Sequence, residues 1–482
     1  MNPPGLSIAI LALHWLIIIG LSFRVVMRRP PIGVSLAWLA VICSLPFVGA
    51  GIYLLFGEKR LGHERVRRIQ AQNDDLAAWQ RTLKAAEPSQ DPAMFALAAP
   101  LQHHAENAVG FPPMTGNEIQ LLGDYESIFD RLVADIDAAG TTVDLDFYAW
   151  QEGGRVADVT DALVRAARRG VRCRGLADAV GSKPFLAGRL PALLRRAGVE
   201  FHVALPAGLL RTVVARTDLR NHRKIAVMDG RVAYSGSQNL VDPRFFKQDA
   251  GVGQWVDAMV RVTGPAVRVL AGVFELDWSV ETGRAFHAPP PAVAGPAVPA
   301  GATIQVVPSG PDRRPEAIHQ LLLSAIYSAR RQLVLTTPYF VPDDAILTAL
   351  VGAAMRGVSV TLIVPAHNDS VLVRYASVAH FEDLLSAGVR IALFEGGLLH
   401  TKSLTIDGLV SVFGSVNLDM RSLWLNFEIS LLVYDSEFTG RLCALQSNYL
   451  QAARCLDLDS WRRRPTWRRL VENSCRLAGP LL

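Results

Sequence analysis

Two short segments of the sequence carry the same chemically capable residues at the same spacing. Each has a histidine, a lysine two positions later, an aspartate five positions after the lysine, and then a Gly-Ser-x-Asn tail. Only six of the 49 lysines and arginines are lysines, and two of those six occupy the repeated position. One copy would be a weak motif, whereas two copies with matching tails are a specific signal. The residues are His222, Lys224, Asp229, Ser237 and Asn239, and again His400, Lys402, Asp407, Ser415 and Asn417.

The spacing within each segment fits a β-strand, in which residues two positions apart point to the same face. The histidine and lysine of each segment therefore project together. The Asp-Gly dipeptides at 229–230 and 407–408 are typical of a tight turn, and the return strand would carry serine and asparagine back to the same place. If the two segments pack with pseudo-twofold symmetry, both histidines, both lysines and both asparagines converge on one pocket.

Such a pocket suits a phosphodiester. Lysine and asparagine supply charge and donors to phosphoryl oxygens as charge develops during transfer. A neutral imidazole can attack phosphorus while a protonated one donates to the leaving alkoxide, because histidine populates both forms near pH 7. No HExxH or CxxC spacing is present, so we expect chemistry without a metal or another cofactor. Asp229 and Asp407 are candidates for catalysis and, alternatively, for a structural role in the turns.

Carboxylates that orient the histidines are expected on the strand that follows each tail. Glu428 is the candidate in the second segment, and Asp257 holds the corresponding place in the first. Asp249 is an alternative to Asp257. A carboxylate that accepts a hydrogen bond from an imidazole would fix its tautomer and raise its basicity.

The elements that must position these residues form a duplicated unit. The sequence AARRGV at 166–171 corresponds to AAMRGV at 353–358, and RRAGV at 195–199 corresponds to LSAGV at 385–389. Helices that end in glycine and lead into β-branched runs are typical of α/β folds. Because internal repeats determine the fold class, we expect two pseudo-twofold-related α/β/α sandwich domains.

The domain boundaries follow from changes in composition. We expect a transmembrane hairpin at 1–62, a helical linker at 63–110, and the first α/β domain at 111–283. A run rich in proline and alanine at 284–301 cannot sustain a helix or a central strand, so it separates the second domain at 302–482.

The N-terminal region reads as two membrane-spanning helices at about 6–23 and 33–57, each uncharged and long enough to cross about 30 Å of hydrocarbon. No charged side chain precedes Arg24, which argues against a signal peptide. Five basic residues at 59–68 follow the second helix, against three in the loop between the two helices. This difference favours a cytoplasmic catalytic body.

The paired motifs resemble the duplicated HKD motifs of the phospholipase D superfamily. The segments PFVGAGIYLLFGEKR, SGSQNLVDPRFFKQDAGVGQWVD, TTPYFVPDDAILTAL and GSVNLDMRSLWLNFE are similar, more narrowly, to bacterial cardiolipin synthases over nearly the whole chain. The resemblance implies metal-independent transfer between two phosphatidylglycerols through a phosphatidyl-histidine, giving cardiolipin and glycerol. It further implies that His222 is the nucleophile and His400 the general acid, in a multi-pass protein of the bacterial inner membrane.

Other functions remain open at this point. A phospholipase D hydrolase or another phosphatidyltransferase would use the same residues with a different acceptor. A nuclease of the superfamily would need a basic, aromatic groove and no membrane hairpin, so nucleic acid is not an expected partner. A catalytically inactive membrane scaffold is disfavoured by the intact motifs. The expected partners are phosphatidylglycerol and anionic membrane lipids, and the basic tail WRRRPTWRR at 461–469 is a candidate for contact with them.

Overall fold

The computed structural model divides the chain into two compact units. The smaller comprises residues 1–66 with 207–218, and the larger comprises 67–206 with 219–482. Residues 291–300 of the expected proline-rich linker lie outside the described part of the chain. The described residues are 4–29, 32–58, 61–87, 89–206, 216, 218–290, 301–312, 314–477 and 479.

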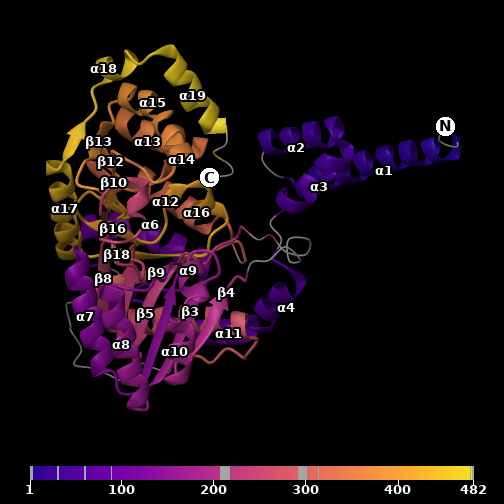
Figure 1. Cartoon of the computed structure of the whole chain (residues 1–482). Helices are drawn as coiled ribbons and strands as arrows, with labels where there is room; N and C mark the ends of the chain where they lie inside the picture. The colour runs from indigo at the N-terminus through magenta and orange to yellow at the C-terminus, as the bar shows by residue number, and fades with distance from the viewer. Residues whose placement is uncertain are drawn as a thin grey trace. The chain divides into compact units, whose positions relative to one another are not determined.

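The smaller unit is built from three apolar helices, drawn in indigo in Figure 1: α1 (Pro4–Arg28), α2 (Ile32–Ser44) and α3 (Pro46–Phe56). Among the described residues, α1 is the one helix whose length and composition suit a membrane crossing, over Leu11–Arg28. The matching prediction of a helix at about 6–23 is thus slightly too short.

The prediction of one continuous helix over 33–57 is wrong. The chain breaks at Leu45, whose φ of −134° and ψ of 68° are not helical, and Pro46 starts a new helix. A residue before proline is disfavoured in the α conformation, and proline itself suits the first position of a helix. The two pieces fold back on each other, since the rings of Trp38 and Tyr53 lie 5.3 Å apart. At 13 and 11 residues they extend only about 20 and 17 Å.

An ion pair ties the end of α1 to the end of α3. Glu58, which is buried, accepts hydrogen bonds from Arg24 Nε at 2.5 Å and Nη2 at 2.8 Å and from the Tyr53 hydroxyl at 3.1 Å. Arg28 Nε lies 3.2 Å from the same carboxylate. A buried carboxylate needs such partners because removing it from water costs several kcal/mol.

The larger unit has one central mixed sheet, to which the described residues contribute fifteen strands. The first half supplies β1 (Met114–Leu122), β2 (Thr142–Phe147), β3 (Arg172–Asp178), β4 (Glu200–Ala204), β5 (Lys224–Met228), β6 (Val232–Gly236) and β8 (Met259–Thr263). The second half supplies β9 (Ala302–Ser309), β10 (Gln332–Thr336), β12 (Ser359–Pro365), β13 (Arg390–Phe394), β15 (Ser403–Ile406), β16 (Val410–Gly414), β18 (Glu428–Tyr434) and β19 (Ala453–Cys455).

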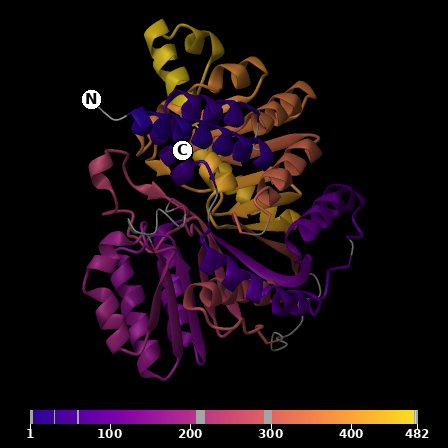
Figure 2. The same ribbon diagram turned by 90° about the vertical axis from the view of Figure 1, so that its right-hand side faces the viewer.

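The strand order is palindromic about the antiparallel pair of β1 and β9, where Met114 is opposite Ile304. Outward from β1 the order is β8, β6, β5, β2, β3, β4, and outward from β9 it is β18, β16, β15, β10, β12, β13. The two halves, magenta and orange to yellow in Figures 1 and 2, are therefore related by a pseudo-twofold axis at this seam. The predicted fold class of two duplicated α/β/α domains is confirmed.

Helices cover both faces of each half. In the first half α7 (Tyr125–Ala138) and α8 (Arg155–Arg168) pack on one face, and α11 (Ala266–Thr282) packs on the other. In the second half α12 (Ala317–Ser328) and α13 (Asp344–Met355) take one face, and α17 (Ser436–Gln451) takes the opposite face. Amphipathic helices and apolar strands bury their apolar sides against each other in this way.

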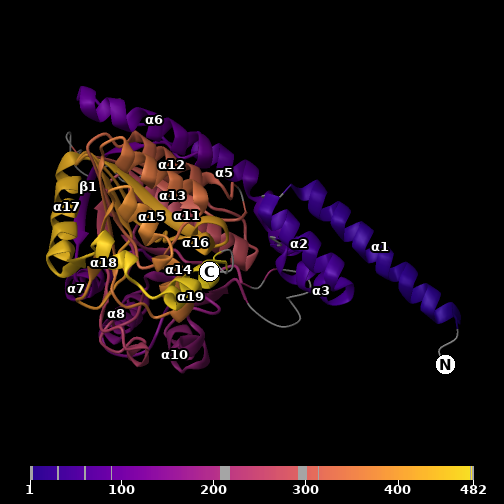
Figure 3. The same cartoon turned by 90° about the horizontal axis from the view of Figure 1, so that it is seen from above.

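The segment expected as a linker at 63–110 forms α4 (His63–Ala71), α5 (Asn73–Gln80) and α6 (Pro92–Val109). Helix α6 lies beside α12 (Figure 3) and packs into the core of the second half. Trp79 of α5 packs against Gly272 of α11, where an added Cβ would meet the indole at 2.0 Å.

A single core runs across the seam of the two halves. It joins apolar residues of β5 and β8 to those of β9, β16 and β18, including Leu431, which is fully buried. The strands that carry the motif residues of both halves are therefore held by one body of packed side chains.

Truncation of Leu431 should destabilise this shared core. We expect Leu431→Ala to lower the free energy of unfolding by about 2–5 kcal/mol, because it removes buried methyl groups and leaves a cavity. Met355→Ala, at a 77% exposed position of α13, should change it by less than about 0.5 kcal/mol. Chemical denaturation of the full chain in detergent measures both. Equal midpoints for the two variants would contradict the shared core.

Candidate active site

Each motif histidine is positioned by the backbone of the other half. The His222 N–H donates to the carbonyl of Phe427 at 2.8 Å, and Asn221 forms a parallel bridge with Phe427. In the second half β14 (Leu398–Leu399) pairs with β7 (Trp255–Val256), and the His400 N–H donates to the Val256 carbonyl at 2.8 Å. The segments that precede β5 and β15 therefore cross the pseudo-twofold axis.

The crossing exchanges the orienting carboxylates between the halves. His222 Nδ1 lies 2.8 Å from Glu428 Oε2, and His400 Nδ1 lies 2.6 Å from Asp257 Oδ1. Sequence reasoning selected these two carboxylates but assigned each to the histidine of its own half, and that assignment is corrected here. Asp249, the alternative in the first half, lies in an exposed 3-10 turn over Gln248–Ala250.

The tail residues support the carboxylates and the surrounding loops. The Ser415 hydroxyl donates to Glu428 Oε2 at 2.6 Å, and the Ser237 hydroxyl accepts from the Ala258 N–H at 3.1 Å beside Asp257. Asn239 Oδ1 accepts from the Ala149 N–H at 3.1 Å. The buried Oδ1 of Asn417 has no hydrogen-bond partner among the described residues.

Both lysines are buried against the motif backbone. Lys224 Nζ donates to the carbonyl of His222 at 2.6 Å, and Lys402 Nζ donates to the carbonyl of His400 at 2.5 Å. Burial lowers the pKa of Lys224 to about 8, although Glu428 and Asp257 oppose the shift. Burial likewise lowers the pKa of Lys402 well below its ordinary value. Besides burial, the charges of both lysines lower the pKa of His222 and of His400.

Burial also decides the charge of the histidines. It lowers the pKa of His222 and of His400 to about 4, outweighing Glu428 and Asp257, which act in the opposite sense. Desolvation would raise the pKa of Asp257, but His400 and Lys402 bring it down to about 2. With the carboxylate ionised, Nδ1–H of each neutral imidazole donates to it and Nε2 keeps a lone pair.

The expectation that one histidine starts protonated does not fit the ligand-free site at neutral pH. Both imidazoles are neutral there, because the desolvation cost of a buried imidazolium is larger than its attraction to one carboxylate. An anionic phosphodiester placed between them would favour the charged form of the nearer one. Protonation of one histidine by a proton from solvent is therefore favoured once an anion is bound.

The two motif aspartates lie at the other end of their strands, away from the histidines. Asp229 accepts hydrogen bonds from the N–H groups of residues 140–142, at 2.7 to 2.9 Å. Asp407 accepts from those of residues 330–332, at 2.8 to 3.3 Å. Each has a φ of 54°, the left-handed conformation of a tight turn. We assign both aspartates to the turns and not to the chemistry.

Three aromatic residues and one arginine complete the site without having been singled out from the sequence. The Tyr148 ring lies 4.8 Å from the His222 ring, measured between ring centroids. The Trp255 and Tyr339 rings lie 4.6 Å and 6.5 Å from the His400 ring. Arg223, between the first histidine and lysine, donates to the Glu428 carbonyl at 3.0 Å and pairs with Asp277. Tyr148 follows β2 and Tyr339 follows β10, the equivalent strand of the second half. This correspondence in the repeated sequence could have identified the two tyrosines as site residues.

Comparison with known proteins gives the same picture. A family model described as "Cardiolipin synthase, PLD-like domain" matches residues 132–278 and 322–445, and one described as "Phospholipase_D-nuclease N-terminal" matches 15–58. Cardiolipin synthase A of Yersinia pseudotuberculosis serotype O:1b (strain IP 31758) is 46% identical over 471 residues, 97% of each chain, and that of Yersinia pestis matches equally.

A solved structure, phosphatidylserine synthase of Haemophilus influenzae Rd KW20, superposes with a TM-score of 0.60 at 14% identity. The match covers 79% of this chain and 100% of that one. At this level of identity it supports the fold alone.

The charge state of the site can be tested directly. In protein labelled with ¹³C in histidine, the resonances of His222 and His400 should titrate with midpoints near pH 4, so both are neutral at pH 7 and become charged only as the pH falls. Exposed His103, which lies outside both motifs, serves as the reference resonance. Resonances are assigned by single His→Gln variants. Midpoints near 6.5 for both motif histidines would contradict the effect of burial.

Proposed function

The chain belongs to the cardiolipin synthase family of phospholipase-D-like phosphatidyltransferases, and we propose that it moves a phosphatidyl group from one phosphatidylglycerol to another. The products are cardiolipin and glycerol. The single observation that supports this proposal is the exchanged pair of imidazole–carboxylate contacts. Each histidine is held through Nδ1 by a carboxylate of the other half, and each lysine donates to the carbonyl of its own histidine.

In the first step Nε2 of His222 attacks the phosphorus of the donor lipid. A P–N bond forms, the P–O bond to the glycerol head group breaks, and the leaving oxygen takes a proton from His400. His400 takes that proton from solvent when the anionic phosphodiester binds, since a nearby negative charge favours imidazolium. Lys224 and Lys402 neutralise charge on the phosphoryl oxygens.

In the second step a hydroxyl of the second phosphatidylglycerol gives its proton to His400 and attacks the same phosphorus. The P–N bond to His222 breaks, and cardiolipin leaves. The choice of His222 as nucleophile rests on the resemblance to the superfamily, because the two histidines have the same kind of partner and similarly lowered pKa values.

Membrane association follows from family membership and agrees with the apolar helix α1. We further propose a multi-pass protein of the bacterial inner membrane with a cytoplasmic catalytic body. Five basic residues between 59 and 68 against three between 24 and 29 support that orientation. A second crossing would require α2 and α3 to straighten at Pro46, because each is too short to span the hydrocarbon alone.

The proposed reaction predicts a defined set of products. Purified full-length protein given phosphatidylglycerol alone should form cardiolipin and free glycerol, without a nucleotide-activated lipid and in the presence of EDTA. Thin-layer chromatography of the lipids and an enzymatic glycerol assay measure both. Phosphatidic acid as the main product would indicate a hydrolase instead. A requirement for CDP-diacylglycerol, or loss of activity in EDTA that metal restores, would contradict the mechanism.

The roles of the histidines predict where a covalent intermediate collects. With a phosphatidyl ester of p-nitrophenol, whose leaving group needs little acid assistance, His400→Ala should accumulate an adduct on His222, because the second step lacks its base. His222→Ala should accumulate none, and the exposed control His103→Ala should turn over normally. Peptide mass spectrometry locates the adduct. An adduct on His400 in the His222→Ala protein would reverse the two roles.

A further inference from the structure

The C-terminal part of the chain extends beyond the duplicated unit. Helix α17 corresponds to α11 of the first half, and after α11 the described residues 283–290 form neither helix nor strand. After α17, in contrast, come β19, α18 (Leu458–Arg462) and α19 (Thr466–Leu477). This extension lies against the second half, where β19 pairs with β13 and α19 packs on α14 (Val371–Val378).

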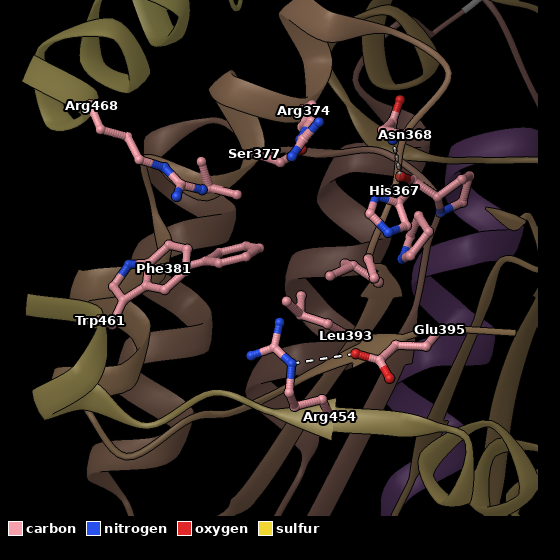
Figure 4. A pocket seen from close by; sticks show the side chains of 15 residues that line it. His367, Asn368, Arg374, Ser377, Phe381, Leu393, Glu395, Arg454, Trp461 and Arg468 are labelled. Atoms are coloured by element: carbon pink, nitrogen blue, oxygen red, sulfur yellow. Dashed lines mark hydrogen bonds and ion pairs between the residues drawn. The ribbon is translucent and has the colours of Figure 1, made fainter. Parts of the chain in front are cut away.

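The extension closes one side of a cavity of about 280 Å³ (Figure 4). Arg454 of β19 and Arg468 of α19 face this cavity from the extension, and Arg374 of α14 faces it from the second half. Polar groups of His367 and Asn368 line one wall, and Phe381, Leu393 and Trp461 provide apolar surface.

The cavity is positively charged. Among its lining residues three arginines stand against one carboxylate, Glu395, which is 3.3 Å from Arg454 Nε. Arg468 Nε lies 3.2 Å from Glu472, a carboxylate that is also shared with Arg464. Within the described residues no carboxylate is in ion-pair distance of Arg374. A planar guanidinium group can donate two parallel hydrogen bonds to phosphate oxygens, so arginine is well suited to bind a phosphate.

The cavity adjoins the catalytic histidine of its own half. Asn368, in its wall, donates to the carbonyl of Pro338 at 2.9 Å. The residues that follow these two in the chain are Tyr339 and Asp369. The Tyr339 hydroxyl donates to Asp369 at 2.9 Å, and the Tyr339 ring lies 6.5 Å from the ring of His400. Pro338 lines the cavity and Tyr339 follows it in the chain, so this segment connects the cavity wall to the surroundings of His400.

Helices α14 and α19, which line the cavity, also carry exposed apolar side chains. Trp467 and Leu470 of α19 are 65% and 68% exposed, and Val371 of α14 is 71% exposed. Helices that combine arginine with exposed tryptophan and leucine suit the interface of an anionic bilayer. These apolar side chains would contribute nothing to the binding of a small soluble phosphate.

We propose that this cavity is a second phosphate subsite, which holds the head-group phosphate of an anionic phospholipid next to the transfer site. The proposal deepens the proposed function, because a transferase that joins two anionic lipids must hold two phosphates at once. In this proposal the cavity holds the phosphate of the acceptor lipid, which is not attacked. The cavity lies on the side of His400, the residue assigned to activate the acceptor hydroxyl. The two extension arginines make this half of the pseudo-symmetric body different from the other.

Binding can be measured without turnover in full-length His400→Asn protein in phosphatidylcholine nanodiscs. The probe is dihexanoylphosphatidylglycerol, and its binding is measured by the change in tryptophan fluorescence. The fluorescence change is measured again in the Trp461→Phe protein. The part that disappears there comes from Trp461 and therefore measures binding in the cavity. Adding Arg374→Gln and Arg454→Gln should weaken this binding ~tenfold or more, since two charge-assisted contacts are removed. Arg463→Gln, in the same extension but outside the cavity lining, should leave it unchanged.

Two further arms complete the test. Replacing Arg454→Gln by Arg454→Lys in the double variant should restore part of the affinity, because the positive charge is kept, and would also show that β19 is intact. Inorganic phosphate and dihexanoylphosphatidylcholine should both bind far more weakly than the phosphatidylglycerol. Unchanged affinity in the double arginine variant, or equal binding of inorganic phosphate, would overturn the proposal. Because no turnover is involved, failure of the synthase reaction in the wild-type protein would be a separate result.

Discussion

Two buried hydrogen bonds between imidazole and carboxylate set the arrangement of the catalytic body. A buried carboxylate without a partner costs several kcal/mol, and a buried imidazole without one loses its orientation. In this chain each histidine finds its carboxylate in the other half, so neither half can satisfy its own buried groups. The seam of β1 and β9, the continuous core across it and the crossing strand ends all serve to hold these two contacts.

The same burial determines how the site can work. Buried imidazoles are neutral, so in the proposed reaction one of them can attack phosphorus, but neither can act as an acid until an anion binds. Burial also lowers the pKa of both lysines, and the carboxylates of Glu428 and Asp257 act in the opposite sense. A phosphodiester thus supplies the condition for its own cleavage, because its charge favours the protonated form of one histidine.

The sequence was sufficient for the fold class, for the two histidines and two lysines, and for Glu428 as an orienting carboxylate, because the repeat and the period of a strand are local properties. It left Asp249 open as an alternative to Asp257. It was not sufficient for which carboxylate serves which histidine. That depends on segments 220–222 and 398–400 crossing to the other half, a contact between residues far apart in sequence. Nor did it reveal that the run from 33 to 57 folds back at Pro46, since apolar composition does not distinguish one long helix from two short ones.

The exchange itself can be observed directly by ¹⁵N NMR of histidine side chains in the Asp257→Asn and Glu428→Gln proteins. The account predicts that Asp257→Asn shifts the Nδ1 resonance of His400 and leaves that of His222 in place, while Glu428→Gln does the reverse. His103 should not move in either variant and serves as an internal reference. A shift of His222 in Asp257→Asn, with His400 unaffected, would show that each half orients its own histidine and would contradict the account.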